Sequence, residues 1–363
     1  DTMKCNFPEY LKLTNNQNDR NIQLQAISNV LADKTRDIER VIDTQTKLEN
    51  SQKERNIQLQ AVSNVLGNKI KNDERNIEYQ LKIIRTDADI RDAVNAWTSD
   101  KTTATPIYGN ISDWNTSSVT NMSELFKDKT TFNQDISDWN TSSVTDMNRM
   151  FYRAEKFNQD ISNWNTSSVT DMNRMFTNAS VFNQPLNTDG NKWNVSLVTD
   201  MNSMFLEASE FNGDISDWDT SKVTSMSYMF SYAEKFNQDI SDWNTSNVTD
   251  MNSMFRSATV FNGDISNWDT SNVENMSRMF LGASAFNKPL NTNGDKWNTS
   301  NVKKMEYMFR DAIAFNQDIS DWDTSNVTDM TAMFYEATAF NKPLNTNGDK
   351  WNTSNVKKME YMF

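Results

Sequence analysis

The chain has 363 residues, of which 36% are hydrophobic, and it carries a formal net charge of −13. It has no histidine and a single cysteine, which excludes Ser-His-Asp and Cys-His catalytic groups, His/Cys zinc sites and an internal disulfide. Residues 1–100 hold 15 basic and 16 acidic residues, whereas the remaining 263 hold 21 and 33, so the acidity lies in the later part and disfavours nucleic acid as a partner.

A helical segment over residues 20–87 is the first predicted element, after an N-terminal tail of residues 1–19. The stretch RNIQLQAISNVL at 20–31 returns as RNIQLQAVSNVL at 55–66, a shift of 35 residues or five heptads. Its apolar residues follow the 3-4 spacing of a coiled-coil seam, which predicts a homo-oligomer held together by this seam. The predicted oligomerisation residues are Leu24, Ile27, Leu31, Ile38, Val41, Leu48, Leu59, Val62 and Leu66.

Two arrangements of this helical segment are open. A continuous helix over residues 20–86 would be a rod of roughly 100 Å at 1.5 Å per residue, and it would need a partner to bury its apolar stripe. The alternative is a helical hairpin that folds on itself with its turn near Gly67, the one glycine of the segment. We favour the oligomeric coiled coil, and the number of chains stays open. The apolar runs of the whole chain are too short to span a bilayer, which takes roughly 20 residues.

Residues 88–110 are the predicted N-terminal cap of the region that follows. Ile90, Ala93, Val94 and Trp97 fall at helical spacing, and the stretch YGNISDW then leads into the first full repeat. The cap is expected to cover the first repeat, because an open end of a repeat stack exposes apolar side chains.

Residues 111–363 form the predicted repeat array, whose period is marked by ten tryptophans. Their spacing is 25 residues six times and 29 residues three times, and residues 287–309 and 341–363 are identical. The tryptophans are Trp114, Trp139, Trp164, Trp193, Trp218, Trp243, Trp268, Trp297, Trp322 and Trp351. A period between 20 and 50 residues indicates stacked units that share one core. The sequence stops inside a unit, so a truncated C-terminus is expected there.

Each unit is expected to contain a turn, a short helix and a short strand. In VTDMNSMFRSA, residues 248–258, the apolar letters fall at helical spacing, whereas FNQDIS at 236–241 alternates as a strand does. The methionines of each unit are expected in the core. Pro185, Pro289 and Pro343 lie in the expected strands of the long units, so those strands should be short or broken.

The stretch FNQDISDWNTSNVTDMNSMF at 236–255, followed by A-x-x-F, resembles the roughly 25-residue bacterial surface protein repeat of mycoplasma lipoproteins. That family, of unknown function, also occurs in algae and large DNA viruses and is similar to BspA-like leucine-rich repeats. The resemblance covers about residues 88–363. It implies an α/β solenoid, leucine-rich-repeat-like, of about ten coils, a surface location and contact with a host.

A column of aspartates on the expected strand face is a candidate metal site. Neighbouring strands lie about 4.8 Å apart, so adjacent carboxylates offer oxygen ligands to calcium. The alternative, which we favour, is a solvated charged face that binds no metal. The column contains Asp135, Asp160, Asp214, Asp239, Asp264 and Asp318.

The letters that vary between units lie after M-F, on the expected helix side, and this makes that side the candidate binding face. Its residues are Tyr152, Arg153, Leu206, Glu207, Tyr232 and Arg256. No pair of carboxylates stands out from the repeated pattern, so neither a catalytic residue nor a cofactor is expected.

The sequence therefore predicts a non-enzymatic, surface-exposed recognition or adhesion module displayed on an oligomeric helical stalk. Its expected partner is a protein or glycan on a host or neighbouring surface, and its expected location is the cell surface or, alternatively, the surface of a virion. A structural component of an extracellular fibre or virion is the second hypothesis, because the N-x-D-x-S face hardly varies between units.

Overall fold

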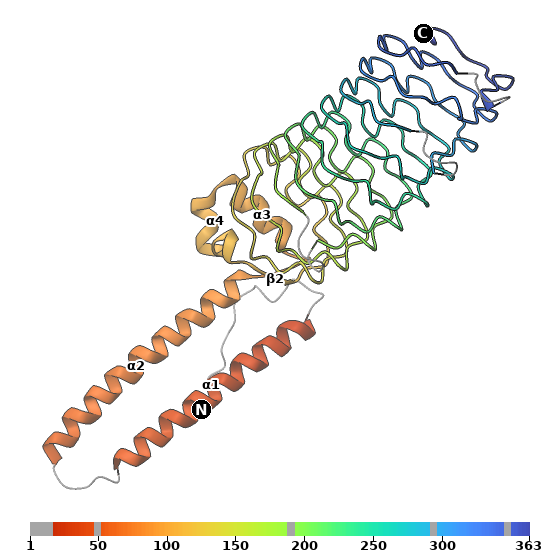
Figure 1. Ribbon diagram of the computed structural model, residues 1–363. Coiled ribbons are helices and arrows are strands. Elements are labelled where there is room, and N and C mark those ends of the chain that lie inside the picture. The colour runs from red at the N-terminus through yellow and green to blue at the C-terminus, as the bar shows by residue number, and fades with distance from the viewer. Residues whose placement is uncertain (1–16, 47–51, 187–192, 291–295, 345–349) are drawn as a thin grey trace. The chain divides into compact units, whose positions relative to one another are not determined.

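The structure is a computed structural model in which two compact units are distinguished (Figure 1). It describes residues 17–46, 52–186, 193–290, 296–344 and 350–363. The first unit ends at Ile84 and includes Ile107–Gly109, and the second contains Arg85–Pro106 and Asn110–Phe363.

Helices α1 (Gln17–Thr46) and α2 (Gln52–Ile83) make up the first unit. Lys34 Nζ on α1 lies 2.7 Å from Asp73 Oδ2 on α2. In one continuous helix these residues would lie about 58 Å apart at 1.5 Å per residue. The helices therefore lie beside each other at this point, and the expectation of a single rod over residues 20–86 is wrong.

Gly67 lies inside α2, so the expected turn near Gly67 is also wrong. A Cβ added at this glycine would meet no atom within 4 Å, which shows that the helix surface there is open. Glycine destabilises a helix by only about 0.5–1 kcal/mol relative to alanine, and the long flanking helical sequence tolerates that cost. The residues between α1 and α2 lie outside the described part of the chain.

Two helices lie within the residues 88–110 that were predicted as the cap. They are α3 (Ile90–Ser99) and α4 (Lys101–Tyr108), and α3 buries the four apolar residues that the sequence placed on one face. Asp89 precedes α3, and its Oδ1 accepts a hydrogen bond of 2.8 Å from the backbone N–H of Thr86. The predicted helical spacing is thus confirmed in α3, whereas α4 was not expected from the sequence.

A small sheet lies next to this cap. Strand β1 (Ile84–Thr86) pairs with β2 (Asn115–Ser118), and the 3-10 helix η2 (Ile111–Asp113) precedes β2. The guanidinium of Arg85 lies 4.6 Å from the ring centroid of Trp114, the first tryptophan of the array. A buried arginine thus covers the first indole ring on the side of the cap.

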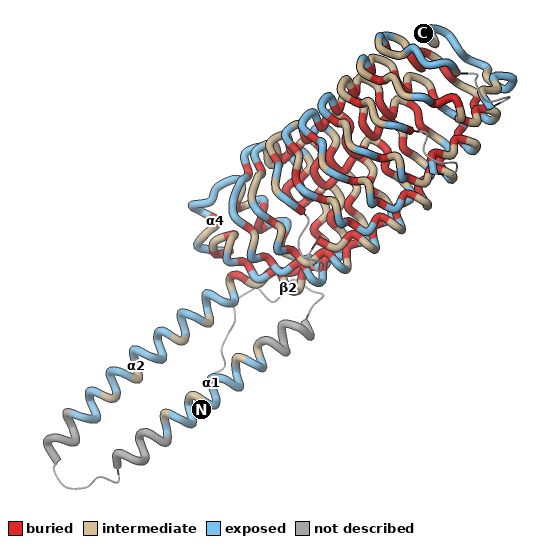
Figure 2. Tube along the Cα trace, in the orientation of Figure 1, coloured by how far each residue is buried: buried red, intermediate tan, exposed pale blue. Residues whose placement is uncertain are grey.

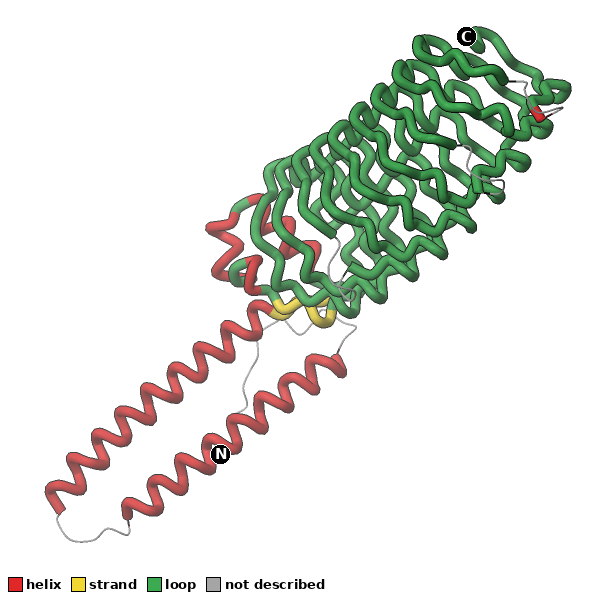
Figure 3. Tube along the Cα trace, viewed as in Figure 1, coloured by secondary structure: helices red, strands yellow, loops and turns green. Residues whose placement is uncertain are grey.

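Beyond β2 the described repeats consist of turns joined by isolated parallel β-bridges (Figure 3). Nine such bridges join each repeat to the next, from Asn121↔Asp146 to Asp329↔Lys358. The expected short helix and short strand of each unit are therefore wrong for the described residues. Successive repeats nevertheless lie side by side, as the 25- and 29-residue periods indicate.

The segment expected to be a helix consists of consecutive turns. We call it the turn ribbon, which in each repeat is the eight residues that begin at the bridge residue, such as residues 146–153. Alternate N–H groups of the ribbon donate to carbonyls of the next repeat. For example, Met147 donates to Asp171 at 2.9 Å and Arg149 to Asn173 at 2.9 Å. The N–H groups between them close turns inside the ribbon. Because half of the donors point to another repeat, an α-helix cannot form.

The apolar residues of the repeats form one core, drawn in red in Figure 2. Phenylalanines of consecutive turn ribbons stack with centroids 5.4–5.8 Å apart, and a second phenylalanine column repeats at 5.9–6.1 Å. Trp139 Nε1 donates to the carbonyl of Ile111 at 2.9 Å, and this bond recurs through the array up to Trp351. Each stacked pair of phenylalanine rings contributes about 0.5–1.5 kcal/mol beyond burial. The indole rings thus join neighbouring repeats.

The FNQDIS segments carry an asparagine ladder in place of a strand. Asn133 Oδ1 accepts the backbone N–H of Asn158 at 2.9 Å, and this contact recurs up to Asn341 at 2.7–3.1 Å. The backbone N–H of Asp160 makes no backbone hydrogen bond. Pro185 occupies the equivalent position one repeat later and therefore breaks no ladder. This is why prolines are tolerated there, contrary to the expected strand.

Candidate interaction surfaces

Two columns of the turn ribbon have positive φ angles, and the varied residues lie in these columns or next to them. Arg149 and Arg153 have φ of 52° and 56°, and their counterparts in the other described repeats are also positive. A left-handed conformation costs a non-glycine residue roughly 1–2 kcal/mol. The backbone N–H of Arg149 and of Arg153 donates to the next repeat, which offsets that cost. The side chains of these columns differ between repeats, and some of them, such as Ser203 and Ser253, are buried.

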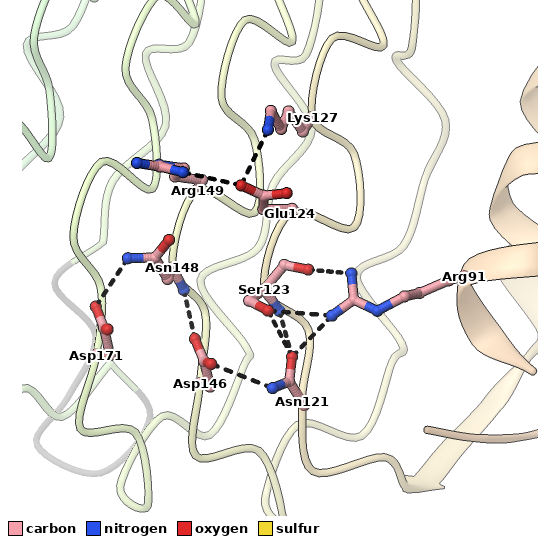
Figure 4. Close-up of polar contacts among 9 residues, drawn as sticks. All are labelled: Arg91, Asn121, Ser123, Glu124, Lys127, Asp146, Asn148, Arg149 and Asp171. Atoms are coloured by element: carbon pink, nitrogen blue, oxygen red, sulfur yellow. Dashed lines mark hydrogen bonds and ion pairs between the residues drawn. The ribbon is translucent and has the colours of Figure 1, made fainter. Parts of the chain in front are cut away.

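In the first repeats these side chains form ion pairs with one another (Figure 4). Glu124 Oε1 lies 3.0 Å from Lys127 Nζ and 3.0 Å from Arg149 Nη1. Hydrogen bonds from these two cations lower the pKa of the Glu124 carboxyl below its usual value, and the bond from Lys127 makes the larger contribution. Asn121 Nδ2 donates to Asp146 Oδ2 at 3.2 Å, so the polar side chains of this part of the ribbon largely satisfy each other.

In the later repeats arginines stack on tyrosines of neighbouring repeats. The guanidinium of Arg256 lies 5.1 Å from the ring centroid of Tyr232, and that of Arg278 lies 4.9 Å from Tyr307. Cation–π contacts of this kind contribute about 0.5–1 kcal/mol at exposed sites and fix the plane of the guanidinium. We call the whole group the Tyr–Arg patch. It contains Tyr232, Arg256, Arg278, Tyr307, Arg310 and Tyr335.

The predicted binding residues all lie on the turn ribbon, but they do not form one cluster. Arg153 is exposed and lies 3.3 Å from Asp128, and Tyr152 and Leu206 are half-buried. Glu207 is exposed and lies in the same ribbon as Leu206, residues 200–207. Tyr232 and Arg256 belong to the Tyr–Arg patch.

Sequence reasoning missed the other four members of the patch. Tyr307, for example, lies between the guanidinium groups of Arg278 and Arg310. The signal was available: aligning the repeats on M-F puts tyrosines and arginines in the columns where other repeats have Ser, Asn or Ala.

The aspartate column closes local turns. Oδ1 of each of its six members accepts the backbone N–H of the serine two residues later at 2.9–3.0 Å. This hydrogen bond, to Ser241 in the case of Asp239, lowers the pKa of the carboxyl. Among the described residues no group of three or more His, Cys, Asp or Glu side chains is placed to hold a metal ion. The column therefore has a role in the fold.

The predicted oligomerisation residues are partly exposed on the helix pair. Leu31 and Leu59 are 40% and 39% exposed, and Leu24, Ile27, Ile38, Val62 and Leu66 are half-buried. Val41 and Leu48 lie outside the side chains that the structure describes. A cleft of about 260 Å³ between α1 and α2 is lined by Ala26, Ile27, Val30, Leu31, Lys34, Asp73, Asn76 and Ile77. The helix pair thus leaves part of its apolar stripe in solvent.

The repeated ladders define this chain as a tandem repeat protein. Three successive matches to one family model, at residues 96–191, 185–294 and 288–363, cover most of the chain. The chain therefore belongs to the family described as "Mycoplasma protein of unknown function, DUF285". No curated protein and no solved structure matches it. In the described part of the chain, no helix is long and apolar enough to cross a membrane.

Proposed function

We propose that this chain is a non-enzymatic recognition module, in which a leucine-rich-repeat-like solenoid similar to the BspA repeats presents its turn ribbon to a partner. One observation carries the proposal. The side chains that vary between repeats lie on the positive-φ columns of the ribbon and beside them, while the ladders and the core hardly vary. A surface that changes on a constant scaffold is typical of binding proteins.

The absence of histidine and the monotony of the carboxylates support a non-enzymatic role. The lowered pKa values of Asp135, Asp239 and Asp264 have a local cause, because in each case the hydrogen bond from a serine two residues later is the main contribution. Shifts of this kind stabilise turns and do not prepare an acid or a base for catalysis.

The proposed partner is a protein or glycan on a host or neighbouring surface, and the proposed location is the cell surface or, alternatively, the surface of a virion. Tyrosine and arginine are the residue types enriched at the centres of binding interfaces, and the later ribbons bring both together in the Tyr–Arg patch. The family description names Mycoplasma, and the resemblance of the repeat to the surface protein repeat of mycoplasma lipoproteins supports a surface location.

The proposal is tested by binding of the labelled full-length chain to a glycan array and to immobilised extracellular-matrix proteins. The variant Tyr232→Ala/Arg256→Ala should lose at least tenfold in affinity for any captured probe, because it removes one end of the Tyr–Arg patch. A matched variant, Lys156→Ala/Lys235→Ala, changes exposed side chains outside the ribbon and should bind as the wild type does. Equal binding by both variants would exclude this end of the Tyr–Arg patch as the binding face.

Oligomerisation through α1 and α2 is the second part of the proposal. Val30 is 55% and Leu31 40% exposed, and both line the cleft between the helices. The variant Val30→Lys/Leu31→Lys should lower the molar mass of the full chain in light scattering, because it puts charge into the proposed seam. An unchanged molar mass, or a monomeric wild type, would remove the stalk from the proposal.

A structural role in a fibre or virion is the second candidate, and the asparagine ladder favours it. The ladder runs from Asn133 to Asn341 with the same contact at every step, including the steps across 29-residue repeats. A uniform ladder is typical of a structural spacer. If the chain is a spacer, it should bind neither the glycan array nor the immobilised matrix proteins, and its ribbon variants should assemble as the wild type does.

A further inference from the structure

A hollow of about 330 Å³ lies on the second unit, where the end of α3 and the start of α4 face residues 128–134 of the first repeat. We call it the cap hollow. Apart from Trp97 and Phe132, its lining is polar, with two lysines, an aspartate, an asparagine, a glutamine and four side chains that carry a hydroxyl group. Its volume is at the lower end of the range of roughly 300–1,000 Å³ that small-ligand sites occupy. The cap hollow can thus hold one small molecule.

Two lysines of the cap hollow lack a carboxylate partner. In the described part of the chain, neither Lys101 nor Lys129 forms an ion pair, although the chain carries a net charge of −13. The Nζ of Lys101 lies 4.8 Å from the ring centroid of Trp97, so the indole ring holds this ammonium group at the hollow. The one carboxylate of the lining, that of Asp128, lies 3.3 Å from Arg153 and is thus partly neutralised. The hollow therefore presents two cations that can pair with an anion.

The indole N–H of Trp97 is a donor without an acceptor. Trp97 is only 4% exposed, and its Nε1 makes no hydrogen bond within the described residues. In the array, by contrast, the indole N–H groups from Trp139 to Trp351 donate to backbone carbonyls of the preceding repeats. A buried donor without a partner is unfavourable, and an acceptor bound in the hollow that Trp97 lines would satisfy it.

The asparagine ladder begins at the cap hollow with donors that have no partner. In the second repeat the backbone N–H of Asn158 donates to Asn133 Oδ1, and the side-chain amide of Gln159 donates to the same oxygen at 2.9 Å. These donors point toward the preceding repeat. Asn133 and Gln134 have no repeat before them, and among the described residues no acceptor bonds the N–H of Asn133 or the amide of Gln134. Both residues are exposed and line the hollow.

We propose that the cap hollow binds an acidic sugar residue, that is, a sugar ring that carries a carboxylate or sulfate group. Lys101 and Lys129 pair with the anionic group, because the groups without partners in the hollow are donors and favour an anion over a cation. The indole N–H of Trp97, the N–H of Asn133 and the amide of Gln134 donate to further oxygens of the ligand. The hydroxyl side chains of the lining suit the hydroxyl groups of a sugar, which a bare inorganic anion lacks.

This site goes beyond the proposed function, because it shares no residue with the Tyr–Arg patch and takes a small ligand. The cap hollow lies at the first repeat, whereas the patch begins at Tyr232 in the fifth. The variant Tyr232→Ala/Arg256→Ala should therefore bind an acidic sugar in the hollow as the wild type does. The two sites can thus fail or succeed separately.

Ligand-observed NMR titration of the full chain tests the proposal with three probes that share one ring, namely glucuronate, glucose 6-sulfate and glucose. At least one of the two anions should bind with a Kd of about 1 mM, as expected for a ligand of this size, and glucose at least tenfold more weakly. Raising the salt concentration from about 50 to 500 mM should weaken binding of the anion severalfold, because salt screens the lysines.

Three results of this titration overturn the proposal. The first is that neither anion binds at about 20 mM, and the second is that glucose binds as tightly as the anions. The third is that inorganic sulfate binds as tightly as glucose 6-sulfate, because the hollow would then be an ion site without selectivity for a sugar. Binding of one anionic sugar alone supports the proposal and identifies the charged group that the hollow selects.

Lysine variants place the binding in the cap hollow. Lys101→Gln/Lys129→Gln should weaken binding of the anionic probe at least tenfold, because it removes both cations. The control Lys222→Gln/Lys235→Gln makes the same change in net charge away from the hollow and should bind as the wild type does. None of these four side chains is buried, so both variants keep the core intact. Equal binding by the two variants overturns the proposal.

A pair of glutamine variants tests the start of the ladder. Gln134→Ala should weaken binding of the anionic probe about threefold, because it removes one donor to the ligand. Gln238→Ala removes an equivalent amide that donates to the carbonyl of Asn212 inside the array, and binding should not change. If Gln238→Ala weakens binding as much as Gln134→Ala does, the ligand does not bind at the cap and the proposal fails.

Discussion

Asp87 Oδ1 accepts the backbone N–H of Thr120 at 2.8 Å, and this contact takes the place of a missing repeat. In the next repeat the equivalent N–H, that of Thr145, donates to the carbonyl of Thr120 at 2.8 Å, and the pattern then continues. Arg91 acts in the same way on the other backbone group, because its Nη1 donates to the carbonyl of Ser123, which no ribbon N–H reaches. The carboxylate of Asp87 and the guanidinium of Arg91 thus take the place of the backbone groups that a preceding repeat would offer to the first repeat.

The variant Asp87→Ala should destabilise the first repeat by about 1–3 kcal/mol, because it leaves the N–H groups of Thr120 and Asn121 without their acceptor. Hydrogen exchange at these two amides measures the effect directly, and exchange in distant repeats should change less. Asp242→Ala removes an exposed aspartate of a middle repeat and is the matched control. Equal protection of Thr120 in wild type and Asp87→Ala would show that the carboxylate is dispensable.

Several features of the fold could be predicted from the sequence because they depend on which residues are buried. The 25-residue spacing identified the tryptophans as core, and Trp164 and Trp268 are fully buried. The turn ribbon could not be predicted in the same way. Its apolar letters fall at i, i+3 and i+4, as in a helix, but this spacing reports burial and not the partner of each N–H. The positive φ of residues such as Arg149 leaves no mark in the sequence.

The candidate surfaces were predicted in part for a related reason. Tyr232 and Arg256 were found because they differ from the other repeats. The contact between Arg278 and Tyr307 joins residues 29 apart, and only the stacking of repeats brings them together. The pairing of α1 with α2 likewise depends on contacts such as Lys34 with Asp73, which heptad spacing does not specify.

Two identical segments of the chain allow the contribution of a neighbouring repeat to be measured. Phe309 and Phe363 end the identical stretches 287–309 and 341–363, yet Phe309 is fully buried and Phe363 is 71% exposed. Phe309→Ala should cost about 3–5 kcal/mol of unfolding free energy, and Phe363→Ala less than about 1 kcal/mol. Denaturant unfolding followed by tryptophan fluorescence compares them, and similar losses would contradict the shared core.

A pair of glycines with opposite surroundings tests how closely repeats approach. A Cβ at Gly213 would lie 2.2 Å from the carbonyl oxygen of Gln184, whereas one at Gly67 would meet nothing within 4 Å. Gly213→Ala should therefore lower the melting temperature, because backbone must move. Gly67→Ala should stabilise α2 by about 0.5–1 kcal/mol. Thermal denaturation followed by circular dichroism gives both signs, and a stable Gly213→Ala would show that the two repeats can separate without cost.

Two aspartates that each close a turn should respond to pH with opposite signs. Burial raises the pKa of Asp250 from its ordinary value of 3.8, whereas the hydrogen bond from Ser241 lowers that of Asp239. The stability due to Asp250 is present below pH 3.8 and is lost as pH rises through its folded pKa. That due to Asp239 is present above pH 3.8 and is lost as pH falls through its folded pKa.

Replacing each of these two aspartates with asparagine keeps the Oδ1 acceptor and removes the charge. At pH 7, Asp250→Asn should therefore stabilise the chain and Asp239→Asn should destabilise it, each by about 1 kcal/mol or less, because Asp239 is exposed and Asp250 is only half-buried. Each difference should shrink as the pH falls through the folded pKa of the aspartate concerned, which happens at a higher pH for Asp250 than for Asp239. Denaturant midpoints at pH 7, 5 and 3 check the signs. Stabilisation by Asp239→Asn at pH 7 would mean that repulsion between neighbouring carboxylates, including Asp214, outweighs the hydrogen bond of the turn.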